Sequence, residues 1–260
     1  MGSPRLPPLS AHAWLRYDAV ERLLPGDVRR VLEIGAGLGA MGALLARRYS
    51  YTGLEPDASS FAIAEQRIGA DKVVPTDDEG YSPAELFDLV CAFEVLEHLE
   101  DDSAALRRWQ RFLRPGGWVL VSVPAGRDRI GPADRRAGHM RRYDRADLEA
   151  VLTRAGLTDP TVVAYGFPLG YALEAGRNVL ARRDVEDSTA RERTSASGRW
   201  LQPPDWAAGA TRALAFPFRL AQRPFARTSL STGLVARARK PESHVPPLTP
   251  DTANADMARL

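Results

Sequence analysis

The chain has 260 residues, a length that suits one large domain or one domain with an insertion. Hydrophobic residues make up 44% and charged residues 26%, which excludes a wholly disordered, collagen-like or disulfide-rich chain. The formal net charge is only +2, and Cys91 is the one cysteine, so an intramolecular disulfide and a thiolate-based zinc site are both excluded, and we expect no metal.

The first half of the chain alternates predicted helices and strands. Apolar spacing predicts an amphipathic helix over residues 11–24, after a Pro-rich start. Further strands are predicted at residues 31–37, 51–56, 72–76, 87–93 and 118–124, with helices at 39–49, 58–68 and 102–112. An Arg-Pro-Gly-Gly turn at 114–117 precedes the last of these strands. This alternation predicts an α/β domain with a parallel sheet.

The second half is less regular. Its predicted elements are a loop or lid at 125–142, a helix at 144–155, strands at 161–166 and 233–239, and helices at 171–182 and from 205 to 214 or beyond. The 66 residues 167–232 are too many for a hairpin loop, so we expect a helical insertion, with a flexible polar loop at 184–199. One domain is therefore expected over 1–240, followed by a disordered tail at 241–260.

The segment VLEIGAGLG, residues 31–39, is the strongest motif: a buried strand that ends in glycines at the start of a helix. Glycines there allow a tight turn and close approach of a ligand to the backbone. The spacing is GxGxG and not the dinucleotide GxGxxG. Glu33 within the strand would repel a pyrophosphate but neutralise a cation. The motif therefore favours a sulfonium and amino-acid cofactor over NAD.

Three more signals lie at or just after the ends of predicted strands, where ligands bind in such sheets. Glu55 is placed to accept hydrogen bonds from a ribose diol, in NAD as in other adenosine cofactors. Asp77 or Asp78 suits an adenine amino group, although a plain polar loop explains them nearly as well. Phe93 and Glu94 begin the segment FEVLEHL at the same crevice.

Together, VLEIGAGLG, YTGLEPD, FDLVCAFEVLEHL and FLRPGGWVLVSVP resemble the class I S-adenosylmethionine-dependent methyltransferases of small molecules, over about residues 28–166. The resemblance implies a Rossmann-like, doubly wound α/β fold. Its seven-stranded sheet has the order 3-2-1-4-5-7-6, with strand 7 antiparallel. The strand predicted at 233–239 fits that place, whereas the long insertion at 167–232 is unusual.

S-adenosylmethionine is the cofactor that the resemblance implies. By the resemblance, Glu33 and the glycine turn would surround the methionine part of the cofactor, and Glu55 would bind its ribose. Asp77 or Asp78 would bind its adenine. Tyr17 would close over the amino-acid end. The expected cofactor-binding residues are Tyr17, Glu33, Gly35, Ala36, Gly37, Gly39, Glu55, Pro56, Asp77, Asp78, Phe93, Glu94 and His98.

Candidates for handling the acceptor come from GHMRRY, residues 138–143, which is similar to a segment that borders the acceptor side in a subgroup of the family. His139 is the candidate general base, because an ordinary histidine accepts a proton near neutral pH. The alternative is an anchor that holds the loop closed. By the resemblance, His98 is structural, while His12 and His244 lie in unpromising places.

Tyr143 is the second candidate catalytic residue, with packing at the helix start as its alternative. Arg141 and Arg142 are candidates to bind an acidic group of a small-molecule acceptor, or are ion-paired. The stretch 206–240 is basic and holds no acid after Trp206, so an acidic carrier protein or a membrane surface is a further candidate partner. No nucleic-acid module is present.

The expected activity is methyl transfer to oxygen, nitrogen or an activated carbon of a small molecule, in specialised metabolism. Residues 125–143 and 167–232 are expected to cover the carboxyl ends of the fourth and fifth strands and to enclose the acceptor. The alternatives are a protein of the same fold that no longer methylates, such as a cyclase or a binding module, and an NAD-dependent oxidoreductase. With no signal peptide at residues 1–9 and no apolar run of roughly 20 residues, a cytoplasmic location is expected.

Overall fold

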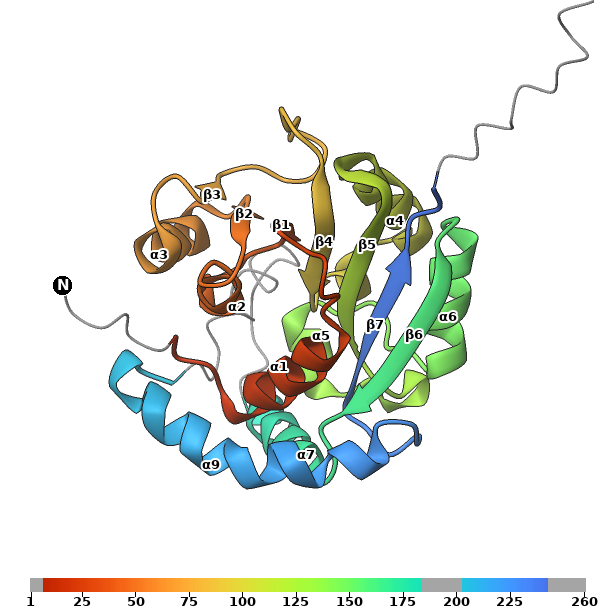
Figure 1. Cartoon of the computed structure of the whole chain (residues 1–260). Helices are drawn as coiled ribbons and strands as arrows, with labels where there is room; N and C mark the ends of the chain where they lie inside the picture. Colours follow the sequence, from red (N-terminus) through yellow and green to blue (C-terminus); the bar gives the residue numbers. More distant parts are fainter. Residues whose placement is uncertain (1–6, 184–202, 243–260) are drawn as a thin grey trace, which may run out of the picture.

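The computed structural model describes residues 7–183 and 203–242 (Figure 1). Within them one sheet has seven strands in the order β3-β2-β1-β4-β5-β7-β6, and β7 is antiparallel to both of its neighbours. The strands are β1 Arg30–Ile34, β2 Ser50–Leu54, β3 Val73–Val74, β4 Phe87–Phe93, β5 Leu113–Pro124, β6 Thr158–Tyr165 and β7 Gly233–Arg239. The predicted fold class and strand order are confirmed.

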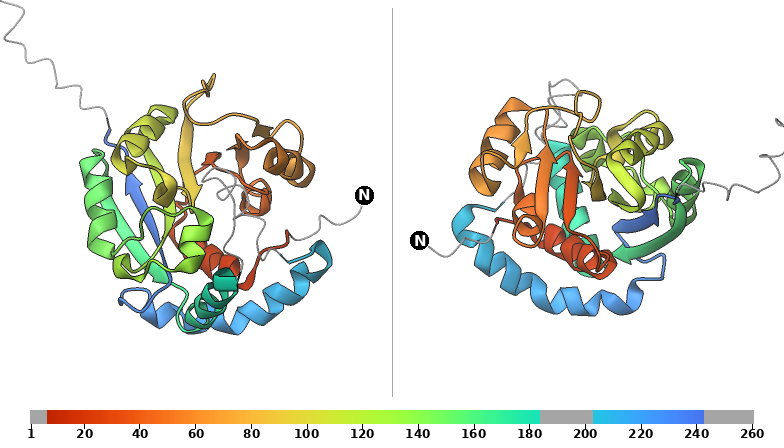
Figure 2. Two further views of the ribbon diagram at one scale, coloured as in Figure 1. Left: turned by 180° about the vertical axis from the view of Figure 1, so that it is seen from behind. Right: turned by 45° about the horizontal axis from the view of Figure 1, so that its top comes forward.

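Helices cover both faces of the sheet (Figure 2). They are α1 Ala11–Leu23, α2 Ala40–Leu45, α3 Ala58–Ile68, α4 Asp102–Trp109, α5 Pro132–Ala137, α6 Arg145–Arg154, α7 Leu169–Arg183 and α9 Ala208–Ala221. Short 3-10 turns lie at η1 Leu96–His98, η2 Gln110–Phe112, η3 Arg127–Arg129, η4 Asp205–Ala207 and η5 Arg223–Phe225. Among the described helices, none combines the length and the apolar character of a membrane span.

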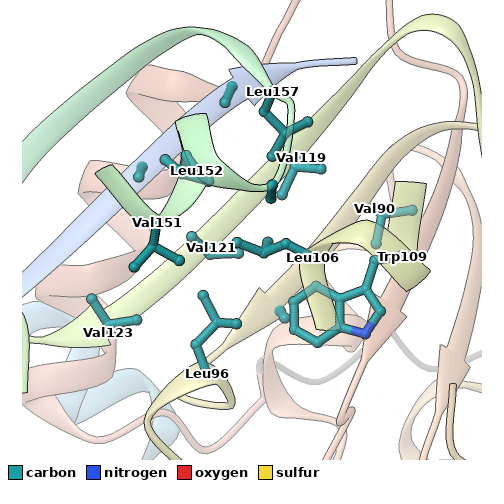
Figure 3. Packing of buried hydrophobic residues seen from close by; sticks show 14 of the residues in the cluster. Val90, Leu96, Leu106, Trp109, Val119, Val121, Val123, Val151, Leu152 and Leu157 are labelled. Atoms are coloured by element: carbon teal, nitrogen blue, oxygen red, sulfur yellow. The ribbon is translucent and has the colours of Figure 1, made fainter. Parts of the chain in front are cut away.

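The apolar core lies on both sides of the central strands, which is why those strands are almost continuously hydrophobic in sequence. On one side Leu106 and Trp109 of α4 pack against Val121 of β5 and Leu152 of α6 (Figure 3), and all four are fully buried. Burial of each such side chain stabilises the fold by roughly 1.5–3 kcal/mol. On the other side α1, α2 and α9 pack against the opposite face.

Several segments differ from the prediction: α2, for example, ends at Leu45 and not at residue 49. The expected loop at 125–142 contains η3 and α5, a helix that begins at Pro132 and is followed by Gly138 at φ +79°. Six residues are too few to show helical periodicity, although the N-terminal proline and C-terminal glycine are its usual signals. Strand β5 begins earlier than expected, because Leu113 pairs with Phe87 across a register shift.

The insertion between β6 and β7 contains α7 and α9, at the places where helices were predicted. Helix α9 packs along α1, where the buried carboxylate of Asp18 accepts hydrogen bonds from Gln222 and Arg223. Helix α7 lies against α5. The predicted flexible loop at 184–199, and the predicted tail beyond Glu242, lie outside the described residues.

Much of the basic stretch 206–240 is bound within the domain itself. Three arginines form ion pairs: Arg219 with Glu21, Arg223 with Asp18, and Arg239 with Glu242. The guanidinium group of Arg237 stacks over the ring of Trp118. Lys240 donates hydrogen bonds to the backbone carbonyls of Gln110 and Leu113. These contacts attach α9 and β7 to the rest of the domain. The aromatic side chains of this stretch have two kinds of surroundings. Phe225 packs against Phe167, whereas Trp206 and Phe216 are exposed to solvent.

Candidate active site

A cavity of about 1680 Å³ lies at the carboxyl ends of β1, β2 and β4. Ligand pockets usually measure about 300–1,000 Å³, so this one has room for two small molecules. The turn after β1 and the residues after β2 line one part of it, and η1, α5 and α7 line another. Residues at the start of α1 line it as well.

The three motif glycines after β1 all have positive φ but serve different purposes. A Cβ on Gly35 would lie 2.8 Å from Cγ2 of Val95, and one on Gly39 would lie 2.8 Å from the backbone of Ala64 in α3. A Cβ on Gly37 would meet no protein atom within 4 Å. Gly39 therefore packs α2 against α3 and does not line the cavity, whereas Gly35 and Gly37 do.

Glu55, directly after β2, stabilises the glycine turn that follows β1 through hydrogen bonds to backbone N–H groups. Its Oε2 accepts the N–H of Gly37 at 2.7 Å, and its Oε1 accepts the N–H of Asp57 at 2.9 Å. Burial raises the pKa of Glu55 above its usual value, although these two hydrogen bonds act in the opposite direction. Glu55 and Pro56 both line the cavity, beside Ala36 of the turn.

Glu33 is buried on the floor of the cavity, where its Oε2 accepts a hydrogen bond from the Tyr51 hydroxyl at 2.6 Å. Burial raises the pKa of Glu33 to about 8, although the Tyr51 hydrogen bond and the charge of Arg16 lower it. A cationic ligand group in the cavity would favour the ionised form of Glu33, and a pyrophosphate would not. This carboxyl group therefore fits a sulfonium or ammonium group.

Glu94, directly after β4, has an unusual backbone with φ +59°. Its Oε1 accepts from the Ser122 hydroxyl at 2.9 Å and the Tyr165 hydroxyl at 3.3 Å, and pairs with Arg16 at 3.4 Å. Burial would raise the pKa of Glu94, but the charge of Arg16 and the hydrogen bond from Ser122 hold it below its usual value. Strained backbones of this kind gather at functional sites. Phe93 lines the cavity next to it.

Helix α1 presents His12 and Arg16 to the cavity, and not Tyr17. Tyr17 is buried against Trp14, ring edge to ring face, at 5.8 Å between centroids. The Nε2 of His12 lies 3.1 Å from Thr232 Oγ1, and burial with the charge of Arg177 lowers the pKa of His12 to about 3. Residues four apart share a helix face, so this spacing could have pointed to His12 and Arg16.

Asp77 and Asp78 do not line the cavity in this structure. The Oδ1 of Asp77 accepts the backbone N–H groups of Glu79 and Gly80, which is a polar turn. The Oδ2 of Asp78 accepts from the side chains of Arg108 and Trp109, both at 3.0 Å, and so fixes α4. The lining of the cavity contains neither carboxylate in this structure.

His139 lies across the cavity from the glycine turn, in contact with two carboxyl groups. Its Nδ1 is 2.9 Å from Oδ1 of Asp134, and its Nε2 is 3.8 Å from Oε1 of Glu97. Burial opposes ionisation of Asp134, but its hydrogen bonds with His139 and Arg142 hold its pKa far below the usual value. Asp134 accepts the hydrogen of Nδ1 of His139, so in the neutral ring Nε2 is the nitrogen with the lone pair.

Arg142 lines the cavity, but its charge is already neutralised. It donates to both oxygens of Asp134, to Oε1 of Glu174 on α7, and to the backbone oxygen of Ala125. Its side chain is only 3% exposed. Arg142 therefore joins α5 to α7, and the structure does not present it as a free acceptor-binding group.

Tyr143 and Arg141 point away from the cavity. The Tyr143 hydroxyl donates to Oδ2 of Asp102 at 3.0 Å, and Arg141 pairs with the same oxygen at 3.2 Å. Both residues line a separate shallow pocket of about 410 Å³. The structure therefore gives Tyr143 the role of anchoring the segment before α6, which was the alternative for it.

Glu97, His98 and His139 form the one group of ligand-type side chains in the described residues able to hold a metal ion, with ligand atoms within 4.8 Å of one another. The rings of His98 and His139 meet edge to face, 4.8 Å apart. Burial and the charge of His139 lower the pKa of His98 to about 4. Burial, with the neighbouring Glu94, raises the pKa of Glu97 well above its usual value.

Comparison with known proteins agrees with this geometry. A family model described as a methyltransferase domain matches residues 11–162, more than half of the chain. The ubiquinone biosynthesis O-methyltransferase of Paracidovorax citrulli is 32% identical over 121 residues, which cover 42% of this chain and 49% of that protein. The chain thus matches about half the length of such curated relatives.

Two solved structures share the fold. A methyltransferase of Thermotoga maritima described as a possible histamine N-methyltransferase has a TM-score of 0.56 and 18% identity, covering 88% of this chain and 89% of its own. Phosphoethanolamine N-methyltransferase 2 of Haemonchus contortus, solved with S-adenosylmethionine, has a TM-score of 0.53 and 18% identity, covering 89% of this chain and 56% of its own. With the family match over most of the sheet, the motifs and the strand order, the chain belongs to the class I S-adenosylmethionine-dependent methyltransferase family.

Proposed function

We propose that this protein transfers the methyl group of S-adenosylmethionine to oxygen, nitrogen or an activated carbon of a small molecule, in specialised metabolism. The observation that carries the proposal is that one cavity contains both the cofactor side and the acceptor side. One side of it has the glycine turn with Glu33 and Glu55, and the other has His139, held by Asp134, and Arg177. Cofactor and acceptor can therefore meet without crossing a protein wall.

On the cofactor side, S-adenosylmethionine supplies an already activated methyl group when bound. The chain's own residues hold and orient it. We propose that Glu33 offers a buried negative charge to its cationic end, and that Gly37 leaves the space beside the turn open. Glu55 keeps this turn in shape through its bonds to Gly37 and Asp57. Alignment of this kind is the main contribution a protein makes to such a displacement.

On the acceptor side, His139 acts through Nε2, which points away from Asp134 and toward Glu97. A hydroxyl or ammonium acceptor must lose a proton for transfer, and a positioned group that governs the proton commonly contributes 10²–10⁴-fold. Helices α5 and α7 line this part of the cavity, and α9 contributes only Thr211. Enclosure of the acceptor is thus assigned to 125–143 and, among the described residues of the insertion, chiefly to α7.

Arg177 suggests which acceptors the cavity selects. Among the arginines that line it in the described residues, Arg16 pairs with Glu94, and Arg142 pairs with Asp134 and Glu174. Within residues 7–183 and 203–242, no carboxylate pairs with Arg177 and its buried Nε has no hydrogen-bond partner. A buried donor without a partner is costly. We therefore propose an acceptor with an anionic group, such as a carboxylate or a phosphate.

Incubation with isotopically labelled S-adenosylmethionine and a metabolite extract of the source cells tests this function. We expect labelled product, and we expect treatment of the extract with an anion-exchange resin to remove the acceptor. Acceptor activity that passes through the resin would contradict the anionic class. Tight binding of S-adenosylhomocysteine without any methyl transfer would favour a cyclase or a binding module. Binding of NAD, with no binding of S-adenosylhomocysteine, would favour an oxidoreductase.

Arg177→Gln should lower transfer at subsaturating extract about tenfold or more, because a charged hydrogen bond contributes about 1.5–3 kcal/mol. The loss should shrink as the extract is concentrated, since binding and not chemistry is impaired. Arg182→Gln is the matched control, because Arg182 lies on the same helix, is exposed and does not line the cavity. Equal transfer by the two variants would remove Arg177 from the acceptor site.

Gly37→Ala should weaken binding of S-adenosylhomocysteine more than tenfold, because the new methyl group would enter open cavity space. The left-handed backbone alone costs roughly 1–2 kcal/mol of stability. Gly156→Ala controls for that cost, since Gly156 has φ +85°, has open space around it and does not line the cavity. Calorimetric titration of both variants measures the difference. If both bound equally well, the space beside Gly37 would not be cofactor space.

A further inference from the structure

Glu97 is a buried acid whose carboxyl oxygens accept no hydrogen bond from another residue that the structure describes. Its side chain is fully buried. Nearly all buried polar atoms in proteins are hydrogen-bonded, so an exception calls for a ligand or a special role. The Nε2 atom of His139, a residue that lines the cavity, lies 3.8 Å from Oε1 of Glu97.

Both histidines beside Glu97 have one ring nitrogen occupied and one available. The Nδ1 of His98 lies 3.2 Å from the backbone oxygen of Gly138, and Nδ1 of His139 lies 2.9 Å from Oδ1 of Asp134. Oxygen atoms of a carbonyl and a carboxylate only accept, so each Nδ1 carries the hydrogen. Each Nε2 is then a lone-pair donor. Metal-binding histidines are typically held in this way by a carbonyl or a carboxylate.

The three side chains are close enough to share one ion. Their ligand atoms all lie within 4.8 Å of one another. Ligands bound at about 2.0–2.3 Å are separated by roughly 3–4.5 Å, so small side-chain rotations complete the site. The neighbouring carboxylates of Glu94 and Asp134 add negative charge around it. Glu94 is not counted as a ligand, because Ser122, Tyr165 and Arg16 already occupy its Oε1.

We propose that Glu97, His98 and His139 bind one divalent transition-metal cation, such as Mn²⁺, Co²⁺ or Zn²⁺. Two imidazole nitrogens and one carboxylate favour these ions over Mg²⁺ and Ca²⁺, which prefer oxygen ligands. Three protein ligands leave further positions open. His98 and His139 line the cavity, so these positions face the acceptor side.

The use of this cation in catalysis rests on the proposed function. A cation lowers the pKa of a hydroxyl group or water that it binds, which prepares an oxygen acceptor for methyl transfer. His139 is then a metal ligand, and the acceptor's proton passes to solvent. Asp134 is a positioning residue, since it fixes the orientation of the His139 ring. Binding of the cation itself does not depend on the proposed function.

Titration of the full-length protein with MnCl₂ alone, after removal of metals by a chelator, tests the binding. We expect one equivalent of Mn²⁺ to bind, and pulsed electron paramagnetic resonance to show coupling to histidine ¹⁴N. Glu97→Gln and His139→Gln should each weaken binding at least tenfold. Asp134→Asn should weaken it by about 10–100-fold, as expected for an outer partner of a ligating histidine.

His12→Gln is the matched control, because His12 lines the same cavity but bonds to Thr232 and lies outside the group. It should bind Mn²⁺ like the parent protein. Absence of saturable binding, absence of ¹⁴N coupling, or equal binding by Glu97→Gln would overturn the proposal. Mn²⁺ binding without methyl transfer would refute only the proposed function. Methyl transfer that chelators leave unchanged, in a protein that binds no Mn²⁺, would refute only the metal site.

Discussion

Arg142→Met is expected to lower the free energy of unfolding by about 3–5 kcal/mol, as for other buried ion pairs that lose one partner. Arg142 lies between two nearly buried carboxylates, Asp134 and Glu174, at 2.7 and 3.1 Å. Methionine fills a similar volume, but it removes two hydrogen bonds from Asp134 and one from Glu174 inside the protein. Urea denaturation at pH 7 measures the loss.

Arg141→Met is the matched control for this change. Arg141 is the next residue, its side chain is 34% exposed, and its partner Asp102 keeps the hydrogen bond from Tyr143 when the arginine is removed. Partly exposed pairs of this kind contribute about 1 kcal/mol or less. Similar losses in the two variants would mean that the bridge between α5 and α7 carries no special share of the stability.

Much of the fold could be predicted from the sequence because the sheet is built from buried strands. Strands β4 and β7 and helix α3 begin and end at the predicted residues, 87–93, 233–239 and 58–68. Each is a clear apolar run or an amphipathic repeat between turn signals. Helix α5 was missed, since six residues hold less than two turns.

The cofactor side of the cavity was also largely within reach of the sequence, because its residues lie at or near the carboxyl ends of strands. Glu33, Gly37, Glu55 and Glu94 all line the cavity for that reason. What the sequence could not show is which polar side chains are already bound by a neighbour. Asp78 is held by α4. Arg142 and Tyr143, from the acceptor motif, are likewise bound within the protein.

The acceptor side depends on contacts between distant segments. His12 meets Thr232, 220 positions later in the chain, and Arg177 reaches the cavity from an insertion with no recognised motif. Asp134, which orients His139, lies in the helix that was missed. The contact of His12 with Thr232 joins α1 to the start of β7, and the packing of α7 against α5 places Arg177, so neither has a local signal in the sequence.

Binding of S-adenosylhomocysteine is expected to tighten about 50-fold between pH 6 and pH 8. In the free protein the pKa of Glu33 is about 8, raised chiefly by burial, so at pH 6 this carboxyl group is almost entirely protonated. The ligand's ammonium group stays protonated over this range and favours the carboxylate. Each pH unit below the pKa then costs close to tenfold in affinity, about 1.36 kcal/mol. The pKa values of His12 and His98, about 3 and 4, lie below this window.

Calorimetric titrations at several pH values measure this slope, and Glu33→Gln isolates its cause. Glutamine keeps an oxygen that accepts from Tyr51 but cannot ionise, so its affinity should be weak and nearly independent of pH. Stability gives an independent check. Because the pKa of Glu33 is raised in the folded protein, this carboxyl group ionises at lower pH in the unfolded chain than in the folded protein. The folded protein therefore loses stability as the pH rises from about 4.5 to 8. Glu33→Gln should abolish that loss. A parent protein with the same affinity at pH 6 and pH 8 would show that Glu33 does not face the cationic end of the cofactor.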